Sequence, residues 1–259
     1  MVKKTVEDSI SEWLLKTGFP LEMEAAQAFR EAGFEVRQSS VQLDPQEGKA
    51  REIDILAEDP DWIGIIEISC VVECKASKNP WVVFTSDAAL QNYNRLFAFG
   101  ITSSEAREAI LKNNSYSRGL KDVMQRPSNK AGYAFRQAFA DKAIDTAYSA
   151  AIASLKACHV ITKDRKEREW PSLRFAFPII VVDAPLFECQ MREDGELIMT
   201  QVEQSDFLFS SYFPDSVGCC IKVVTKSELK KVAIYYKNMA NSIRAEFKGI
   251  EDEVLGRKI

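Results

Sequence analysis

The 259-residue chain has 46% hydrophobic residues, 34 basic and 38 acidic side chains, and a formal net charge of −4. This size allows one large core or two small ones, and no Gly/Pro-rich linker or repeat of fixed period divides the chain, so we expect a single domain over residues 1–259. No apolar run approaches the ~20 residues that span a bilayer and the N-terminus has no apolar signal-peptide core, which predicts a cytoplasmic protein with no membrane partner.

The first elements in chain order are a helix and three strands. The segment from Pro20 to Ala32 is amphipathic and predicts a helix, which Gly33 would end at its C′ position. Three strand-like runs follow at residues 34–41, 51–57 and 63–75.

Charged residues stand on two of these apolar runs. Asp54 lies in the second run, and Glu73-Cys74-Lys75 ends the third. Successive side chains of a strand point to opposite faces, so Glu73 and Lys75 share a face and Cys74 turns to the other. If the two runs pair, Asp54 can approach Glu73 closely, and two such carboxylates repel unless a proton or a cation sits between them.

A magnesium ion suits such a carboxylate pair. Mg²⁺ takes one or two protein carboxylates, keeps several waters and uses substrate phosphate oxygens as further ligands, and Mn²⁺ is its expected substitute. Lys75 would then face the attacking water or the phosphoryl charge. Phosphodiester hydrolysis is the reaction that needs this set of groups, with Asp54 and Glu73 as the metal ligands.

Asp54 followed by Glu73-Cys74-Lys75 resembles the D…(D/E)xK core of the PD-(D/E)xK nuclease superfamily. The order of the first helix and the three strands also resembles the superfamily's α-β-β-β-α-β order. The resemblance covers roughly residues 20–100 with a later strand, and Ile53 replaces the proline of the family name, a position without chemistry. It implies a restriction-endonuclease-like α/β fold, a mixed β-sheet flanked by helices.

Two further site residues are implied by the same resemblance. Many members carry an acid on the first helix, and Glu22 is our choice because it shares a helix face with Ala26 and Phe29; Glu24 sits farther round the helix. Some members carry a Gln on the helix after the Lys strand, and Gln91 resembles it loosely, although it could equally be a solvent-facing residue.

Each of these residues also has an ordinary structural interpretation. Asp54 could pair with Arg51 or Lys49 at a strand edge. Glu73 and Lys75 could form a surface ion pair, and Glu22 could be a first-turn acid favoured by the helix dipole. The combination favours the metal site, because acids on apolar strands are costly to bury unless something compensates them.

The region from residue 86 to 157 predicts helices. Ser86-Asp87 fits the N-cap of a helix over residues 88–97, in the place of the family's helix after the Lys strand. A break at residues 126–129 precedes a long Ala-rich helix over residues 131–156. We therefore expect a helical insertion at about residues 100–157.

The last third predicts a return to the sheet. Residues 173–184 form a continuous apolar run typical of a buried central strand, and Glu193-Asp194-Gly195-Glu196 predicts a hairpin before a strand at 197–202. Another strand is expected at 219–224, and a C-terminal helix at about 227–250. The domain core is thus expected at about 20–100 plus 170–225, with Asp183 as an alternative acid.

The cysteines and the one histidine predict no further chemistry. The six cysteines show no CxxC spacing, so reduced core thiols are expected. His159 lies in an apolar context and is interpreted as structural. A hydrolase that uses Cys158 with His159 is disfavoured, because neighbours in a strand point to opposite faces.

Two basic clusters could line a nucleic-acid channel, although solvated helix faces look much the same. The net charge of −4 argues against a nonspecific nucleic-acid coat but leaves room for a local basic groove. The first cluster lies in the expected helical region and the second follows it; their members are Lys112, Arg118, Lys121, Arg126, Lys130, Arg136 and Lys142, then Lys163, Arg165, Lys166 and Arg168.

The function expected from the resemblance is a metal-dependent nuclease that cleaves DNA, with RNA a weaker expectation, in restriction, antiphage defence or repair. The alternative is a noncatalytic module of the same fold that binds nucleic acid or a protein partner. A homodimer or an activating partner is compatible with either function. The motif fixes neither the sequence specificity nor the choice between endonuclease and exonuclease.

Overall fold

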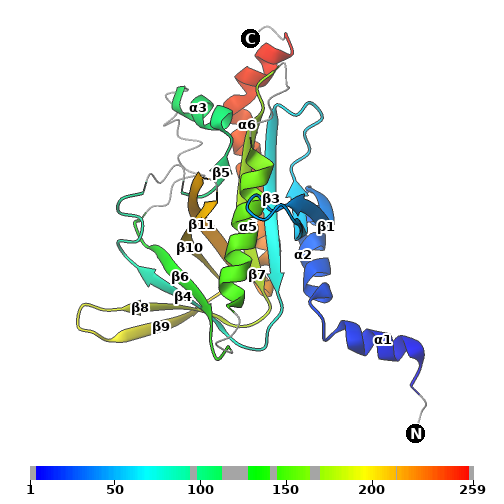
Figure 1. The fold of residues 1–259 in the computed structure, drawn as a ribbon, viewed down its shortest axis with the longest axis vertical. Helices are drawn as coiled ribbons and strands as arrows, with labels where there is room; N and C mark the ends of the chain where they lie inside the picture. The colour runs from blue at the N-terminus through cyan, green and yellow to red at the C-terminus, as the bar shows by residue number, and fades with distance from the viewer. Residues whose placement is uncertain are drawn as a thin grey trace.

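The strands of this protein form one mixed sheet flanked by helices (Figure 1). The structure is a computed structural model that describes residues 4–93, 98–112, 128–140, 145–163, 170–213 and 215–256, without the side chains of 213 and 215–217. The strand order is β1-β2-β3-β7-β11-β10-β6-β4-β8-β9, with β5 beside β7. The expected α/β class is confirmed. None of the described helices is both long and apolar enough to cross a membrane.

The described elements have the following bounds in chain order: α1 (Val6–Leu14), α2 (Phe19–Glu31), β1 (Glu35–Leu43), β2 (Ala50–Glu58), β3 (Ile66–Lys75), β4 (Trp81–Ser86), β5 (Ile101–Thr102), α3 (Ser104–Lys112), β6 (Ala131–Gln137), α5 (Thr146–Thr162), β7 (Leu173–Val182), β8 (Leu186–Met191), β9 (Leu197–Val202), β10 (Gln204–Phe213), β11 (Asp215–Thr225), the 3₁₀ turn η2 (Lys226–Glu228) and α6 (Leu229–Val254). In Figure 1, α1 extends away from the body of the molecule, and none of its residues is buried.

One half of the sheet is built from two separate parts of the chain. After α2, the strands β1, β2 and β3 pair antiparallel in sequence. The chain then forms β4, β5, α3 and β6 before α5 leads to β7, which pairs in parallel with β3. The helix and three strands predicted for residues 20–75 are confirmed, and Gly33 follows α2 with φ of 94°. A positive φ there suits a glycine because it has no Cβ to clash.

Helices cover both faces of the sheet where β3 and β7 lie. Alternate residues of β3 separate the two faces: Cys70 and Val72 belong to the core formed with α2 and α6, whereas Val71 packs into the core formed with α5. All ten residues of β7 are buried, as the continuous apolar run predicts. The α5 and α6 helices lie on opposite sides of this part of the sheet in Figure 1.

The helix expected at residues 88–97 is wrong over its described part. Residues 87–93 form turns after β4, which itself is a strand that pairs with β6 and β8. Leu90 is buried against Ala98 and Cys220, and its backbone N–H donates to the carbonyl of Asn129 at 3.0 Å. This tertiary contact takes the place of a helical hydrogen bond. Residues 94–97 lie outside the described residues.

The Ala-rich helix expected at residues 131–156 is also wrong at its start, because residues 131–137 form β6. The Phe135 ring lies between those of Trp81 and Phe207, with ring centroids 5.0 and 5.2 Å apart. Gly132 allows this close packing, since a Cβ there would collide with Val83 and Phe207. The expected helical insertion at 100–157 is therefore helical only in part, with α3 and α5 as its described helices.

The C-terminal predictions are confirmed in their main features. The expected central strand is β7, the expected hairpin joins β8 and β9 antiparallel, and the final helix α6 begins after η2. The strand β10 was not predicted. Cys158 and His159 lie on α5 rather than on the strand assumed for them. All six cysteines are buried free thiols, as expected.

Candidate functional site

Asp54 and Glu73 lie where β2 and β3 part. The antiparallel pairing of these strands ends with Ile55 opposite Val72, so the next pair in the same register is Asp54 opposite Glu73. The carboxylate of Asp54 takes part in the contact at this point, because its Oδ2 accepts a hydrogen bond of 2.7 Å from the backbone N–H of Cys74. The sheet thus brings together the two acids that the sequence singles out.

The neighbouring strand is irregular at the same position. In the pairing of β1 with β2, Gln38 lies opposite Ile55 and Ser40 opposite Ile53, so Ser39 faces Asp54. Ser39 has φ of 52°, in the left-handed region that side chains other than glycine rarely adopt. Such a conformation costs on the order of 1 kcal/mol or more and persists when the surrounding structure enforces it. Asp54 therefore sits at a local distortion of the sheet.

Glu73 and Lys75 form a buried ion pair. Lys75 Nζ lies 3.1 Å from Glu73 Oε2, on the same face of β3 as the alternation predicts. Glu73 is 4% exposed, and the Lys75 side chain is half-buried at 24% exposure. The pair is therefore not the surface ion pair of the ordinary interpretation.

The charges of Asp54, Glu73 and Lys75 act on the pKa values of Glu73 and Lys75. Burial raises the pKa of Glu73 to about 7, and the nearby charge of Asp54 adds to the shift while Lys75 opposes it. Burial would lower the pKa of Lys75, but the charges of Glu73 and Asp54 outweigh it and raise that pKa. A carboxyl group with a pKa near neutrality can exchange a proton or accept a cation under physiological conditions.

The charge of Asp54 also acts on Glu22, the acid predicted on the first helix. It lies in the first turn of α2, as the ordinary interpretation also holds, and Ala26 and Phe29 on the same helix face are fully buried. Burial raises the pKa of Glu22, and the charges of Asp54 and Glu52 raise it further. Glu24 faces elsewhere and pairs with Lys226 at 2.7 Å.

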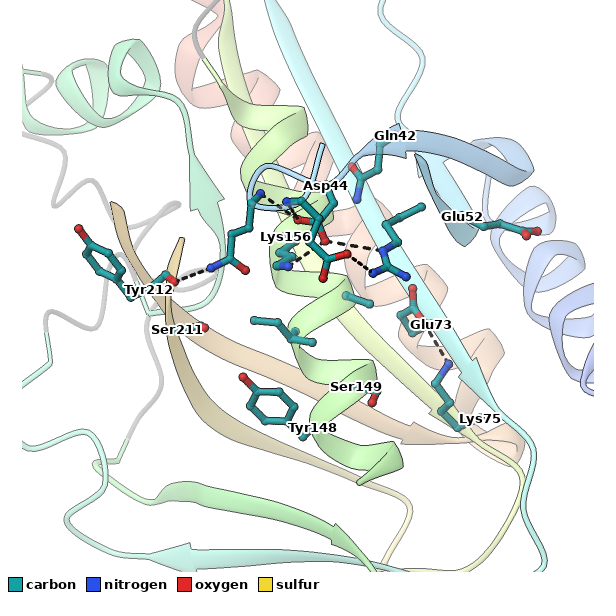
Figure 2. Close-up of a pocket in the computed structure, with 15 residues that line it drawn as sticks. Gln42, Asp44, Glu52, Glu73, Lys75, Tyr148, Ser149, Lys156, Ser211 and Tyr212 are labelled. Carbon is teal, nitrogen blue, oxygen red and sulfur yellow. Dashed lines mark hydrogen bonds and ion pairs between the residues drawn. The ribbon is translucent and has the colours of Figure 1, made fainter. Parts of the chain in front are cut away.

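A cavity of about 600 Å³ opens beside Glu73 and Lys75 (Figure 2). It is bounded by the hairpin that joins β1 to β2, by the end of β3, by one face of α5 and by the end of β10. The described lining residues are Gln42, Asp44, Gln46, Glu47, Arg51, Glu52, Glu73, Lys75, Tyr148, Ser149, Ile152, Ala153, Lys156, Ser211 and Tyr212. Asp54 and Glu22 are not part of this lining.

A second buried acid, Asp44, organises the hairpin end of the cavity. Its carboxylate accepts hydrogen bonds from the backbone N–H groups of Gln46 and Glu47 and from Lys156 Nζ at 2.8 Å, and Arg51 lies 3.7 Å away. Burial alone would raise the pKa of Asp44, but these hydrogen bonds and the charge of Lys156 lower it to about 2. Asp44 thereby fastens the β1–β2 hairpin to α5.

The lining residues outside β3 are ones that the sequence reasoning missed. Asp44 stands in an Asp-Pro turn that ends at Gly48, which has φ of 64°, so turn chemistry was a usable signal for its position. Tyr148 and Lys156 recur on one face of α5, but the helix expected over residues 131–156 concealed where that face begins. No sequence signal pointed to Tyr212.

Two other predicted residues do not reach the cavity. Gln91 lies in a turn rather than on the helix expected after the Lys strand. Its side chain is exposed and does not line the cavity. Asp183 is exposed after β7, where its Oδ1 accepts a hydrogen bond of 2.7 Å from the N–H of Ser77.

The described members of the basic clusters lie away from the cavity. Lys112 pairs with Glu108 at 3.2 Å and Lys130 with Glu188 at 3.0 Å, while Arg136 lies 3.7 Å from an acid on the α5 N-cap. Lys163 is exposed at the end of α5. The remaining members fall outside the described residues: Arg118, Lys121, Arg126, Lys142, Arg165, Lys166 and Arg168.

The donor set fits a magnesium ion in its chemistry. Over the described ranges, no group of three or more His, Cys, Asp or Glu side chains is arranged to hold a metal ion. Mg²⁺ needs only one or two protein carboxylates, because water and phosphate oxygens complete its shell. Asp54 accepts its hydrogen bond through Oδ2, and Glu73 contacts Lys75 through Oε2. The other carboxylate oxygen of each residue could serve as a metal ligand.

Comparisons of the chain with protein-family models, with curated proteins and with solved structures found no match. Membership of the PD-(D/E)xK superfamily stays a prediction from the residues and their order.

Proposed function

We propose that this protein is a metal-dependent nuclease that hydrolyses phosphodiester bonds, built on a restriction-endonuclease-like domain. The order α2, β1, β2, β3, followed by α5 and β7 after the intervening β4, β5, α3 and β6, with β3 and β7 parallel, supports this fold assignment. In the proposal, Asp54 and Glu73 hold Mg²⁺, Lys75 acts on the reacting groups, and Glu22 supports the metal or a water.

One observation carries the proposal: a buried carboxylate, Glu73, lies opposite a second carboxylate, Asp54, at the point where their strands part. Burial and the neighbouring charge raise the pKa of Glu73 to about 7. Holding two acids in this way costs folding free energy unless a cation compensates them. Because the pair costs stability when it is empty, binding of a divalent cation is the role that best explains its presence.

The chain's own residues supply positioning and charge. A bound Mg²⁺ would offset the negative charge that develops on the phosphoryl group and make the attacking water more acidic. Lys75, held at 3.1 Å from Glu73, orients that water or stabilises the phosphoryl oxygens. The water gives up a proton to solvent as its oxygen bonds to phosphorus, the bond from phosphorus to the leaving oxygen breaks, and that oxygen takes up a proton from solvent.

DNA is the proposed substrate, because the resemblance in Asp54 and Glu73-Cys74-Lys75 implies DNA more than RNA. Restriction, antiphage defence or repair are the settings in which such an enzyme acts.

The direct test is cleavage of supercoiled, linear and single-stranded DNA, with an RNA control, in Mg²⁺, in Mn²⁺ and in EDTA. Asp54→Asn keeps an acceptor for the Cys74 N–H but loses the charge, and Lys75→Ala removes the cation. We expect each variant to lose about 10²- to 10³-fold in rate, as for removal of one charge-stabilising group. Lys130→Ala, whose ion pair lies away from the cavity, should cleave like the wild type.

Metal binding is tested separately by thermal unfolding with Mn²⁺. The wild type should unfold at a higher temperature with the ion, because a ligand that binds only the folded state stabilises it, and Asp54→Asn should lose this shift. Cleavage that all variants retain equally would indicate a contaminant. Absence of both cleavage and a thermal shift would overturn the nuclease proposal in favour of a noncatalytic binding module.

A further inference from the structure

Two exposed aromatic rings line the same cavity as Glu73 and Lys75. Tyr148, on α5, is 48% exposed, and Tyr212, on β10, is 74% exposed. The Tyr148 ring meets Phe209 edge to face, with centroids 5.7 Å apart and an angle of 72° between the planes. This contact holds the Tyr148 ring in place. In Figure 2 the two tyrosines lie on one side of α5, and Glu73 and Lys75 lie on the other.

Three uncharged residues of α5 also line the cavity: Ser149, Ile152 and Ala153. Serine and alanine side chains are short, so flat groups can lie against this part of the helix. A path for stacked planar groups therefore leads from the tyrosines toward the Glu73–Lys75 pair.

The charges of the cavity do not suit a double helix. Its described lining has four carboxylates and three basic side chains, and every one of the three bases has a carboxylate partner: Lys75 with Glu73 at 3.1 Å, Arg51 with Glu47 at 3.0 Å, and Lys156 with Asp44 at 2.8 Å. Duplex DNA carries about one charge per 1.7 Å of its axis, and nonspecific binding to it comes essentially from Lys and Arg side chains that neutralise phosphates. A single strand also benefits from basic side chains along its backbone, but stacking on aromatic rings adds about 5- to 150-fold in affinity per base, which does not come from charge.

The hairpin end of the cavity is bridged. Gln46 Nε2 donates to the backbone carbonyl of Tyr212 at 3.0 Å. The β1–β2 hairpin thus contacts β10, which is distant in the sequence. The bases of a duplex are already paired and stacked within the helix, whereas those of a single strand can turn out onto protein rings. A cavity of about 600 Å³ bridged in this way suits separate bases.

We infer that this cavity takes an unpaired nucleic-acid strand, whose bases stack on Tyr148 and Tyr212 while its backbone reaches Lys75. The inference rests on the proposed function, because Glu73 and Lys75 form one end of the cavity. It names the substrate class of that site: single strands, overhangs or flaps rather than continuous duplex.

Binding tests the inference without cleavage. The fluorescence anisotropy of a labelled single-stranded DNA oligonucleotide and of its duplex is measured with the full chain in EDTA. The single strand should bind more tightly. Tyr148→Ala should weaken its binding by about 5- to 150-fold, the effect of losing one stacked base, and Tyr148→Phe should retain it. Tyr133→Ala is the matched control, because Tyr133 is 60% exposed but outside the cavity.

A second variant guards against a loss that comes only from misfolding. Ala153→Leu fills the floor of the cavity on a helix that favours leucine, so single-strand binding should fall while thermal unfolding stays unchanged. Tighter binding of the duplex, or equal binding by wild type and Tyr148→Ala, would overturn the inference, as would an absence of binding in EDTA.

Cleavage of the same DNAs in Mg²⁺ separates the two proposals. If duplex is cut as fast as single strand, the inference fails and the nuclease proposal stands. If nothing is cut and Mn²⁺ gives no thermal shift, although Tyr148→Ala weakens single-strand binding, the strand-binding cavity stands and the nuclease proposal fails.

Discussion

Two buried acids at opposite ends of one cavity have pKa values that are shifted in opposite directions. Asp44 and Glu73 are each 4% exposed, yet the pKa of Asp44 is lowered to about 2 and that of Glu73 is raised to about 7. Burial opposes the charged form of both. Asp44 overcomes it with two backbone N–H donors and Lys156, whereas Glu73 has one lysine and the repulsion of Asp54.

The comparison teaches that partners, rather than burial, decide what a buried acid does. A carboxylate that is fully hydrogen-bonded stabilises the fold and has little capacity left for a ligand. A carboxylate that is buried with few donors costs stability and is available for a cation or a proton. Asp44 belongs to the first kind and Glu73 to the second.

The largest expected effect comes from removing the well-partnered acid. Asp44→Ala would leave Lys156, whose side chain is 12% exposed, without its counter-charge and would free two backbone donors. We expect the free energy of unfolding to fall by about 3 to 5 kcal/mol, measured by urea denaturation. The loss should be the same at about pH 5 and about pH 8, because the stability from a lowered pKa is lost only as the pH falls through about 2. A fall in the free energy of unfolding of less than about 1 kcal/mol would contradict the view that the partners of Asp44 stabilise the fold.

Glu73→Gln should have a smaller effect with the opposite sign and a pH dependence. The folded-state pKa of about 7 lies above the usual 4.5, so the wild type loses stability as the pH rises from about 4.5 to about 7, and the amide of the variant has no charge to lose. In EDTA at about pH 8 we expect the variant to be more stable than wild type by about 1 to 3 kcal/mol, the lower part of the range reflecting the lost partner of Lys75. The two proteins should converge at about pH 4.5 in urea denaturation. A difference that does not vary between these pH values would show that Glu73 does not titrate there.

The smallest expected effect is at the exposed partner of Asp44. Arg51 lies 3.7 Å from Asp44, and its side chain is 54% exposed. Arg51→Ala should therefore lower the free energy of unfolding by less than about 1 kcal/mol. The same urea experiment measures it beside Asp44→Ala, and an equally large loss would mean that Arg51 is the main partner of Asp44.

The sequence predicted the parts of the fold in which local pattern and tertiary packing agree. The α2 helix has a clear apolar face, which is buried, and the apolar runs that carry Asp54 and Glu73 form β2 and β3, with β3 buried along most of its length. The opposition of Asp54 and Glu73 followed from a simple assumption, that neighbouring apolar runs pair.

The sequence misled where packing overrides local propensity. Residues 131–137 are rich in alanine and glycine, yet they form a strand because Phe135 stacks between two distant rings and Gly132 admits their approach. The turn around Leu90 depends on contacts with Asn129 and Cys220, which are distant in the sequence. The Asp-Pro turn gave a local signal for the position of Asp44, but Tyr212 meets the cavity only through β10, so its role has no short-range signature.

β7 pairs in parallel with β11, and β11 pairs antiparallel with β10, which makes β10 a wall of the cavity, although the two acids stand on β2 and β3. The groups proposed for chemistry and the rings proposed for binding thus come from separate segments of the chain. Under the two proposals, substitutions in β10 would change which substrates enter without altering the Asp54–Glu73 register. Specificity would then evolve separately from catalysis.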